Sequence, residues 1–136
     1  MTVRIASCRC GQLRASATGE PVRVSACHCL ACQKRSGSAF ATQARWPALA
    51  VKVEGRSKEW VRTADSGQAV IYSFCPDCGS TVHYTGGNFP DLIAIALGAF
   101  DDPYFAAPRF SVWEGRKHDW VDIVGPVEHS AAGTRT

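Results

Sequence analysis

The chain is dominated by short segments in which apolar and polar residues alternate. The alternation is regular between residues 13 and 17, where Leu13, Ala15 and Ala17 are separated by polar residues. Because successive side chains of a strand point to opposite faces, this period predicts strands with one buried face. Similar stretches recur between turn-forming residues, at residues 22–26, 51–53, 60–62, 69–74, 81–84, 92–97 and 110–113. The pattern therefore predicts a mostly β domain of short antiparallel strands.

Some stretches support more specific predictions. Residues 51–53 and 60–62 are joined by a short segment that contains Gly55, which predicts a hairpin. Residues 69–74 form an apolar run that predicts a strand buried on both faces. The one stretch that we interpret as a helical turn is residues 30–36.

Length and composition indicate a single domain. The chain has 136 residues, of which 46% are hydrophobic and 20% charged, so it can bury one core and is not typical of disordered proteins. We place the domain at residues 1–126 and expect the small, polar residues 127–136 to form a flexible tail.

The charge pattern and the apolar segments indicate where the protein works. The net charge of +3 comes from scattered Lys and Arg residues without a long basic run, so no nucleic-acid partner is expected. The first residues lack the apolar stretch of a signal peptide, and no segment approaches the length that crosses a membrane. We therefore expect a cytoplasmic protein with no membrane partner, whose thiols stay reduced.

All cysteines of the chain fall into three groups. There are seven, and they are Cys8 and Cys10, then Cys27, Cys29 and Cys32, then Cys75 and Cys78. Cysteines scattered through a core would not sort in this way, and compact sets of thiolates suit zinc. Redox chemistry between Cys27 and Cys29 is the weaker interpretation, because redox thiols occupy C-x-x-C motifs in βαβ units, which this sequence lacks.

The number of cysteines predicts two different metal sites. Two cysteine pairs complete one closed tetrahedron, which is the arrangement of a structural zinc, whereas three ligands with one open position are typical of a catalytic zinc. We assign Cys8, Cys10, Cys75 and Cys78 to the structural site and Cys27, Cys29 and Cys32 to the catalytic site. Two zinc ions per chain are expected, with the three-cysteine ion the more labile. His28 lies between two ligands, so its side chain is expected to point away from their metal.

These cysteine motifs and their neighbours resemble a known family. The segments Cys8-Arg9-Cys10-Gly11, Cys27-His28-Cys29 with Cys32-Gln33-Lys34-Arg35-Ser36-Gly37, and Phe74-Cys75 with Cys78-Gly79-Ser80 are similar to those of the glutathione-dependent formaldehyde-activating enzymes, a family that also contains centromere protein V. The similarity extends through residues 97–103 to Trp120. It implies a zinc-stapled fold of the Mss4-like type, with the same division into a four-cysteine and a three-cysteine zinc.

The resemblance also implies an activity. Members condense glutathione with formaldehyde to S-hydroxymethylglutathione, a reaction classed in reverse as that of a carbon–sulfur lyase. On this basis the partners are a small thiol and a small aldehyde, and Lys34 and Arg35 become candidate contacts for the glutathione carboxylates. The alternative for these two residues is a pair of solvated cations on a helical turn.

One position departs from the family pattern. Members often carry a histidine shortly after a proline before the last strand, and here Pro108 is followed by Ser111 at that place. The competing function is a zinc-binding module without enzymatic activity, which binds glutathione or a protein partner. A purely structural module is expected to complete its second tetrahedron, and the three-cysteine group does not.

Overall fold

The computed structural model describes residues 1–133 and contains two β-sheets. The smaller sheet contains β1 (Val3–Ser7), β2 (Arg14–Thr18) and β5 (Val51–Glu54). The larger sheet contains β3 (Arg23–Cys27), β4 (Ala41–Pro47), β6 (Lys58–Thr63), β7 (Ala69–Phe74), β8 (Thr81–Gly86), β9 (Phe89–Ala96), β10 (Phe110–Val112) and β11 (Glu128–His129). Helix α1 spans Leu30–Ser36, and short 3₁₀ turns occupy Ala48–Ala50, Leu97–Ala99 and Glu114–Arg116. The predicted mostly β domain is confirmed.

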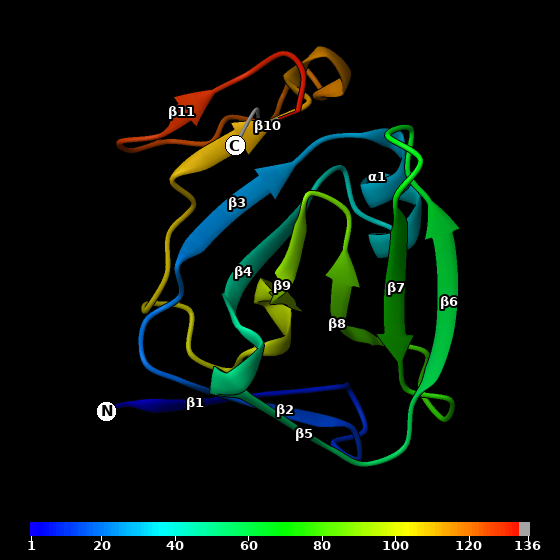
Figure 1. Ribbon diagram of the computed structural model, residues 1–136. Helices are drawn as coiled ribbons and strands as arrows, with labels where there is room; N and C mark the ends of the chain where they lie inside the picture. The colour runs from blue at the N-terminus through cyan, green and yellow to red at the C-terminus, as the bar shows by residue number, and fades with distance from the viewer. Residues whose placement is uncertain (134–136) are drawn as a thin grey trace.

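The strand order brings distant parts of the chain together. In the larger sheet it is β11-β10-β3-β4-β9-β8-β7-β6, so β4 pairs on one side with β3 and on the other with β9, which is distant in sequence. Pairing is antiparallel except at β10, which runs parallel to both β3 and β11. The sheet curves around the molecule, and the smaller sheet lies across its lower end in Figure 1.

The hydrophobic core lies between the two sheets. Leu13, Ala15 and Ala17 supply the buried side chains of the smaller sheet, as their alternation predicts. The opposing residues include Trp46, which is fully buried and donates from its indole N–H to the carbonyl oxygen of Gly19 at 3.0 Å. Phe100 packs against the Trp46 ring at 5.7 Å. One face of the larger sheet is therefore committed to the core, which leaves the other face free for a site.

The hairpin predicted between residues 51–53 and 60–62 is wrong. β5 pairs with β2 in the smaller sheet, whereas β6 pairs with β7 in the larger one. The segment between them is held by Gln12, whose side-chain amide bonds both the N–H and the carbonyl oxygen of Arg56. Gly55 has φ of 98°, and a Cβ there would lie 2.1 Å from the Gln12 carbonyl oxygen. This close crossing separates the two strands instead of turning one onto the other.

One further prediction needs correction. β7 is not buried on both faces along its length, because only Tyr72 and Ser73 are buried and its first residue is exposed.

The flexible tail expected at residues 127–136 stays a prediction. The described part of this segment contains β11, and the N–H of Trp113 bonds the carbonyl oxygen of Ala132 at 3.0 Å. Small and polar residues form this edge because backbone hydrogen bonds need no apolar side chain. Residues 134–136 lie outside the described chain.

The helix expected at residues 30–36 is confirmed as α1. It ends at Gly37, which has φ of 68° and donates its N–H to the carbonyl oxygen of Gln33 at 2.9 Å. Glycine adopts this left-handed conformation without steric cost, which makes it the usual helix terminator. Among residues 1–133, no helix is long and apolar enough to cross a membrane.

Candidate metal centres

Four cysteines from the start and the middle of the chain meet beside the smaller sheet. The sulfur atoms of Cys8, Cys10, Cys75 and Cys78 all lie within 4.8 Å of one another. The Sγ–Sγ distance is 3.6 Å between Cys8 and Cys10 and 3.7 Å between Cys10 and Cys75. A tetrahedron with metal–sulfur bonds of about 2.3 Å has edges of about 3.8 Å, so these spacings fit a zinc ion. The residues predicted for the closed site are therefore brought together.

The backbone around this cluster directs hydrogen-bond donors at the sulfurs. The N–H groups of Leu13 and Asp77 point to the sulfurs of Cys8 and Cys75 at 3.3 and 3.4 Å. The side-chain amide of Gln12 donates to Cys75 at 2.9 Å. Hydrogen bonding to the hydroxyl and backbone N–H of Ser80 lowers the pKa of the Cys78 thiol to about 5. Such donors stabilise thiolates, which are the form that binds metal.

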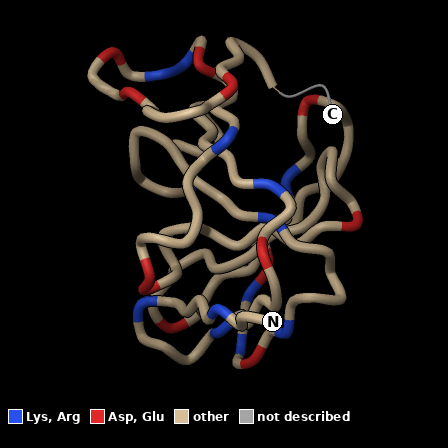
Figure 2. Tube along the Cα trace, turned by 90° about the vertical axis from the view of Figure 1, so that its left-hand side faces the viewer, with Lys and Arg blue, Asp and Glu red and all other residues tan. Residues whose placement is uncertain are grey.

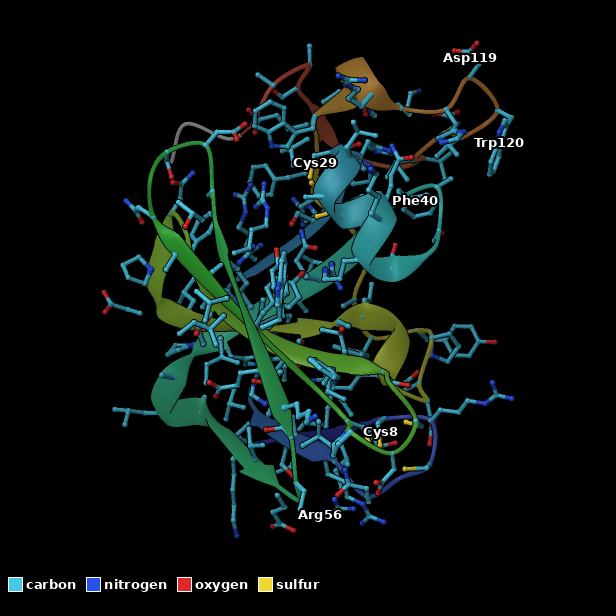
Figure 3. All side chains as sticks on the ribbon, turned by 90° about the vertical axis from the view of Figure 1, so that its right-hand side faces the viewer. Cys8, Cys29, Phe40, Arg56, Asp119 and Trp120 are labelled. Carbon is cyan, nitrogen blue, oxygen red and sulfur yellow. The ribbon has the colours of Figure 1, made fainter. Side chains whose placement is uncertain are left out.

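The second cluster lies at the other end of the molecule, as the labels of Cys8 and Cys29 in Figure 3 show. Cys27 ends β3, Cys29 caps the N-terminus of α1 and Cys32 lies in its first turn, and their sulfurs are within 4.8 Å of one another. The Cys29 sulfur accepts the N–H of Cys32 at 3.4 Å. Hydrogen bonds from the Cys27 and Cys32 thiols lower the pKa of Cys29 to about 2. The cluster thus favours at least one thiolate, as a metal site requires.

His28 points to the opposite side of β3 from this cluster. The ring is fully buried, its Nε2 lies 2.9 Å from the Ser111 hydroxyl, and it packs against Phe40 at 5.7 Å. Ser111 pairs with Ala26 in the parallel ladder, so it lies on the same side of the sheet as His28. The serine that departs from the family pattern therefore supports a buried histidine and does not face the three thiols.

The free face of the larger sheet carries polar side chains beside the three thiols. Arg23, Ser25 and Cys27 alternate along β3 and so share this face. Tyr72 and Tyr84 lie farther across it, opposite each other on β7 and β8. A cavity of about 400 Å³ opens here, lined among others by all three thiols, Arg23, Arg45, Arg62, both tyrosines and Trp113. None of the described residues that line it is Asp or Glu.

The two cations predicted from sequence to bind substrate differ in position. Lys34 is exposed, whereas Arg35 is half-buried with its guanidinium 4.8 Å from the Tyr84 ring and 5.4 Å from the Tyr72 ring. The hydrogen bond to Cys27 lowers the pKa of the Cys32 thiol, but hydrogen bonding to Cys29 and burial raise it overall, and the charge of Arg35 opposes this rise. Lys34 and Arg35 both line a neighbouring cavity of about 430 Å³. Figure 2 shows positive and negative residues dispersed along the trace. The site is cationic because the fold gathers arginines from different strands around it, and not because the sequence contains a basic segment.

Sequence reasoning missed three arginines of this site, namely Arg23, Arg45 and Arg62. One signal was available: Arg23-x-Ser25-x-Cys27 has the period of two that places all three side chains on one face of a strand. The other two arginines come from strands whose pairing the sequence does not reveal.

Tyr84 anchors the polar network behind the cavity. Its hydroxyl donates to the Gln43 Oε1 at 2.8 Å, and the Gln43 Nε2 donates to the Ser25 Oγ at 2.5 Å. Tyr84→Phe would leave a buried acceptor without its donor, so we expect the free energy of unfolding to fall by about 1–3 kcal/mol. Chemical denaturation measures this change. Tyr104→Phe is the matched control, because Tyr104 is 92% exposed and should change nothing; equal stability of both variants would contradict the role of the network.

The fold and the two clusters define a class: a mostly β protein with one closed and one open set of cysteines, each able to hold a metal ion. Within this class, residues 3–116 match the family model described as glutathione-dependent formaldehyde-activating enzyme. The chain belongs to that family.

A comparison with solved structures supports the fold. A crystal structure of a Rhodobacter sphaeroides protein, a structural genomics target, aligns with a TM-score of 0.56 and 17% identity, over 73% of this chain and 91% of the other. At this identity the similarity shows the fold alone. The comparison with curated proteins gave no match.

Proposed function

We propose that the protein condenses glutathione, or a similar small thiol, with formaldehyde or another small aldehyde, as an S-hydroxymethylglutathione synthase of the carbon–sulfur lyase type. Family membership supports a glutathione- and formaldehyde-related role in general. The observation that carries the specific proposal is the three-thiol cluster opening into a cavity lined by arginines and free of described carboxylates. A closed structural site would not need such a cavity.

We assign zinc to both clusters, with Cys8, Cys10, Cys75 and Cys78 holding a structural ion. Cys27, Cys29 and Cys32 would hold the catalytic ion, because three ligands leave one coordination position open. A metal at this site would lower the pKa of a thiol that binds there, so the thiol would react as a thiolate.

The protein's own residues would bind and orient the thiol. The arginines around the cavity attract an anionic peptide and hold its carboxylates. Arg35 adds positive charge beside Cys32, and Lys34 lies at the exposed end of α1, where it can contact a carboxylate. The walls formed by Tyr72 and Tyr84 limit access from that side. These contacts raise the effective concentration of the thiol at the reacting aldehyde.

The reaction can be tested by exchange NMR. A mixture of glutathione and formaldehyde is in equilibrium with S-hydroxymethylglutathione, and the protein loaded with metal should accelerate exchange above the uncatalysed rate. The measurement compares the exchange rate at several protein concentrations, with Cys29→Ser protein as the control. An unchanged rate, with both clusters shown to hold metal by elemental analysis, would favour a binding module without activity.

A further inference from the structure

Arg23 and Arg45 form an unusual pair of like charges on the free face of the larger sheet. They lie directly opposite each other in the ladder between β3 and β4. Like charges in this position destabilise a sheet unless something compensates them. Burial and the charge of Arg45 both lower the pKa of Arg23, and burial lowers the pKa of Arg45. The pair therefore costs stability in the free protein.

No acidic side chain of the described residues neutralises the pair. Among residues 1–133, neither arginine has a carboxylate within 4.0 Å, and Glu128 acts on Arg23 only from a greater distance. The Arg23 Nε is buried without a hydrogen-bond partner in the same part of the chain. Buried guanidinium groups are normally paired with anions, because a buried N–H donor without a hydrogen-bond partner costs free energy.

Aromatic rings hold the two guanidinium groups in place. The Arg23 Cζ lies 3.9 Å from the centroid of the Phe110 ring, and the Arg45 Cζ lies 4.5 Å from that of Phe89. Stacking of this kind restricts the side chains without using their N–H donors. Beside Arg45 in the sheet lies Ala94, whose small side chain separates Arg45 from Tyr84 and leaves room above the strand.

Arg45 leans toward the three thiols. Its Nη1 donates to the Ser25 Oγ at 3.3 Å, and Ser25 also accepts from Gln43. With both donors on its oxygen, the Ser25 hydroxyl can direct its own proton into the cavity. Ser25 and Cys27 share a face and are two residues apart, which corresponds to about 7 Å along a strand. A ligand whose anion bonds Ser25 and whose thiol lies at Cys27 would therefore carry that anion about 7 Å from its sulfur.

We infer that Arg23 and Arg45, with the Ser25 hydroxyl, bind the carboxylate of a peptide-like thiol whose sulfur lies at Cys27, Cys29 and Cys32. The glycyl carboxylate of glutathione has the required separation from its thiol when the peptide is extended, whereas the carboxylate of free cysteine lies too close to its sulfur. This inference rests on the proposed function for the identity of the thiol. The inference goes beyond that function in one respect: it states that the glycyl end of the peptide is recognised, by Arg23, Arg45 and Ser25.

Calorimetric titration of the metal-loaded protein tests the inference. Glutathione is compared with its glycyl monoethyl ester, which lacks that negative charge but keeps the thiol. The ester should bind wild-type protein about tenfold to a hundredfold more weakly, the range expected for loss of a charge-assisted pair. Arg45→Gln should weaken glutathione by a similar factor and should bind glutathione and the ester almost equally, because the same contact is then already lost. Arg45→Lys should bind glutathione with intermediate affinity.

Controls separate this contact from general effects. Lys52→Gln removes the same charge from the exposed side of the smaller sheet and should bind glutathione as wild type does. S-methylglutathione cannot offer a free thiol but keeps the carboxylate, so Arg45→Gln should weaken its binding too. Arg23→Gln provides a second variant, and circular dichroism checks the fold of each. The ester comparison on wild-type protein needs no substitution at all.

The results distinguish this inference from the proposed reaction. Equal binding of glutathione and the ester to wild-type protein, or no measurable binding of glutathione, would overturn it. The same holds if Arg45→Gln weakens the ester as much as it weakens glutathione. The calorimetric results can agree with the carboxylate site while the NMR assay shows no accelerated exchange. In that case the carboxylate site is supported and the proposed reaction is contradicted.

Discussion

Cys75→Ser is expected to prevent the domain from folding stably. Cys75 is fully buried, and its cluster joins residues 8–10 to residues 75–78 across a long loop. Because such a site does not exist in the unfolded chain, its metal-binding free energy is folding free energy, on the order of 10 kcal/mol or more for structural zinc. That is comparable to the whole stability of a typical domain. Soluble yield, circular dichroism and metal content measure the loss.

Asp77→Asn is the matched control for this substitution. Asp77 lies in the same turn, is exposed and pairs with Arg56 at the surface, so the variant should fold and keep its metal. A Cys75→Ser protein as stable and as metal-rich as this control would show that the four-cysteine cluster has no structural role.

Cys29→Ser is expected to give a folded protein that holds about one zinc per chain and no longer binds glutathione. The three-cysteine cluster spans only residues 27–32, so its metal closes a short loop and contributes less to stability. Cys29 also caps α1 by accepting the N–H of Cys32, and serine is itself a favourable N-cap residue. The substitution therefore removes the ligand while it preserves the start of the helix. Elemental analysis, thermal melting and calorimetry measure the three outcomes.

The difference between the closed four-cysteine cluster and the open three-cysteine cluster also predicts the order in which the metal ions leave. With one position open to solvent, the three-cysteine ion should leave first when a chelator is added to wild-type protein, and the four-cysteine ion should follow only with unfolding. Metal released in parallel with the loss of circular dichroism signal from the start of the titration would contradict this order. So would a Cys29→Ser variant that unfolds as completely as Cys75→Ser.

The grouping of the candidate metal ligands could be predicted from the sequence. Cysteine ligands are few, and their grouping is local, so the division into Cys27, Cys29 and Cys32 on one hand and two pairs on the other follows from counting. The structure brings together the same groups. Helix α1 was also predictable, because its end depends on Gly37 and on local hydrogen bonds.

Strand pairing could not be predicted in the same way. Alternation shows that residues 51–53 and 60–62 are extended, but a strand's partner depends on long-range contacts that alternation does not contain. Here the Gln12 side chain and the close approach at Gly55 send the two strands to different sheets. A local hairpin pattern was overridden by contacts with a segment more than forty residues away, since Gln12 bonds Arg56 at a sequence separation of 44.

The sequence by itself determined the ligand groups, the strand-rich composition and the short helix, because each depends on neighbours in the chain. Only the tertiary structure decided what surrounds the open cluster. Arg23 and Arg45 become a pair through the register of β3 and β4, and Tyr84 reaches the same face through β9. An arginine in a sequence of mixed charge is usually a solvated cation. Here it becomes a candidate for ligand binding, because the sheet places it in a partly buried cavity with no described carboxylate to neutralise it.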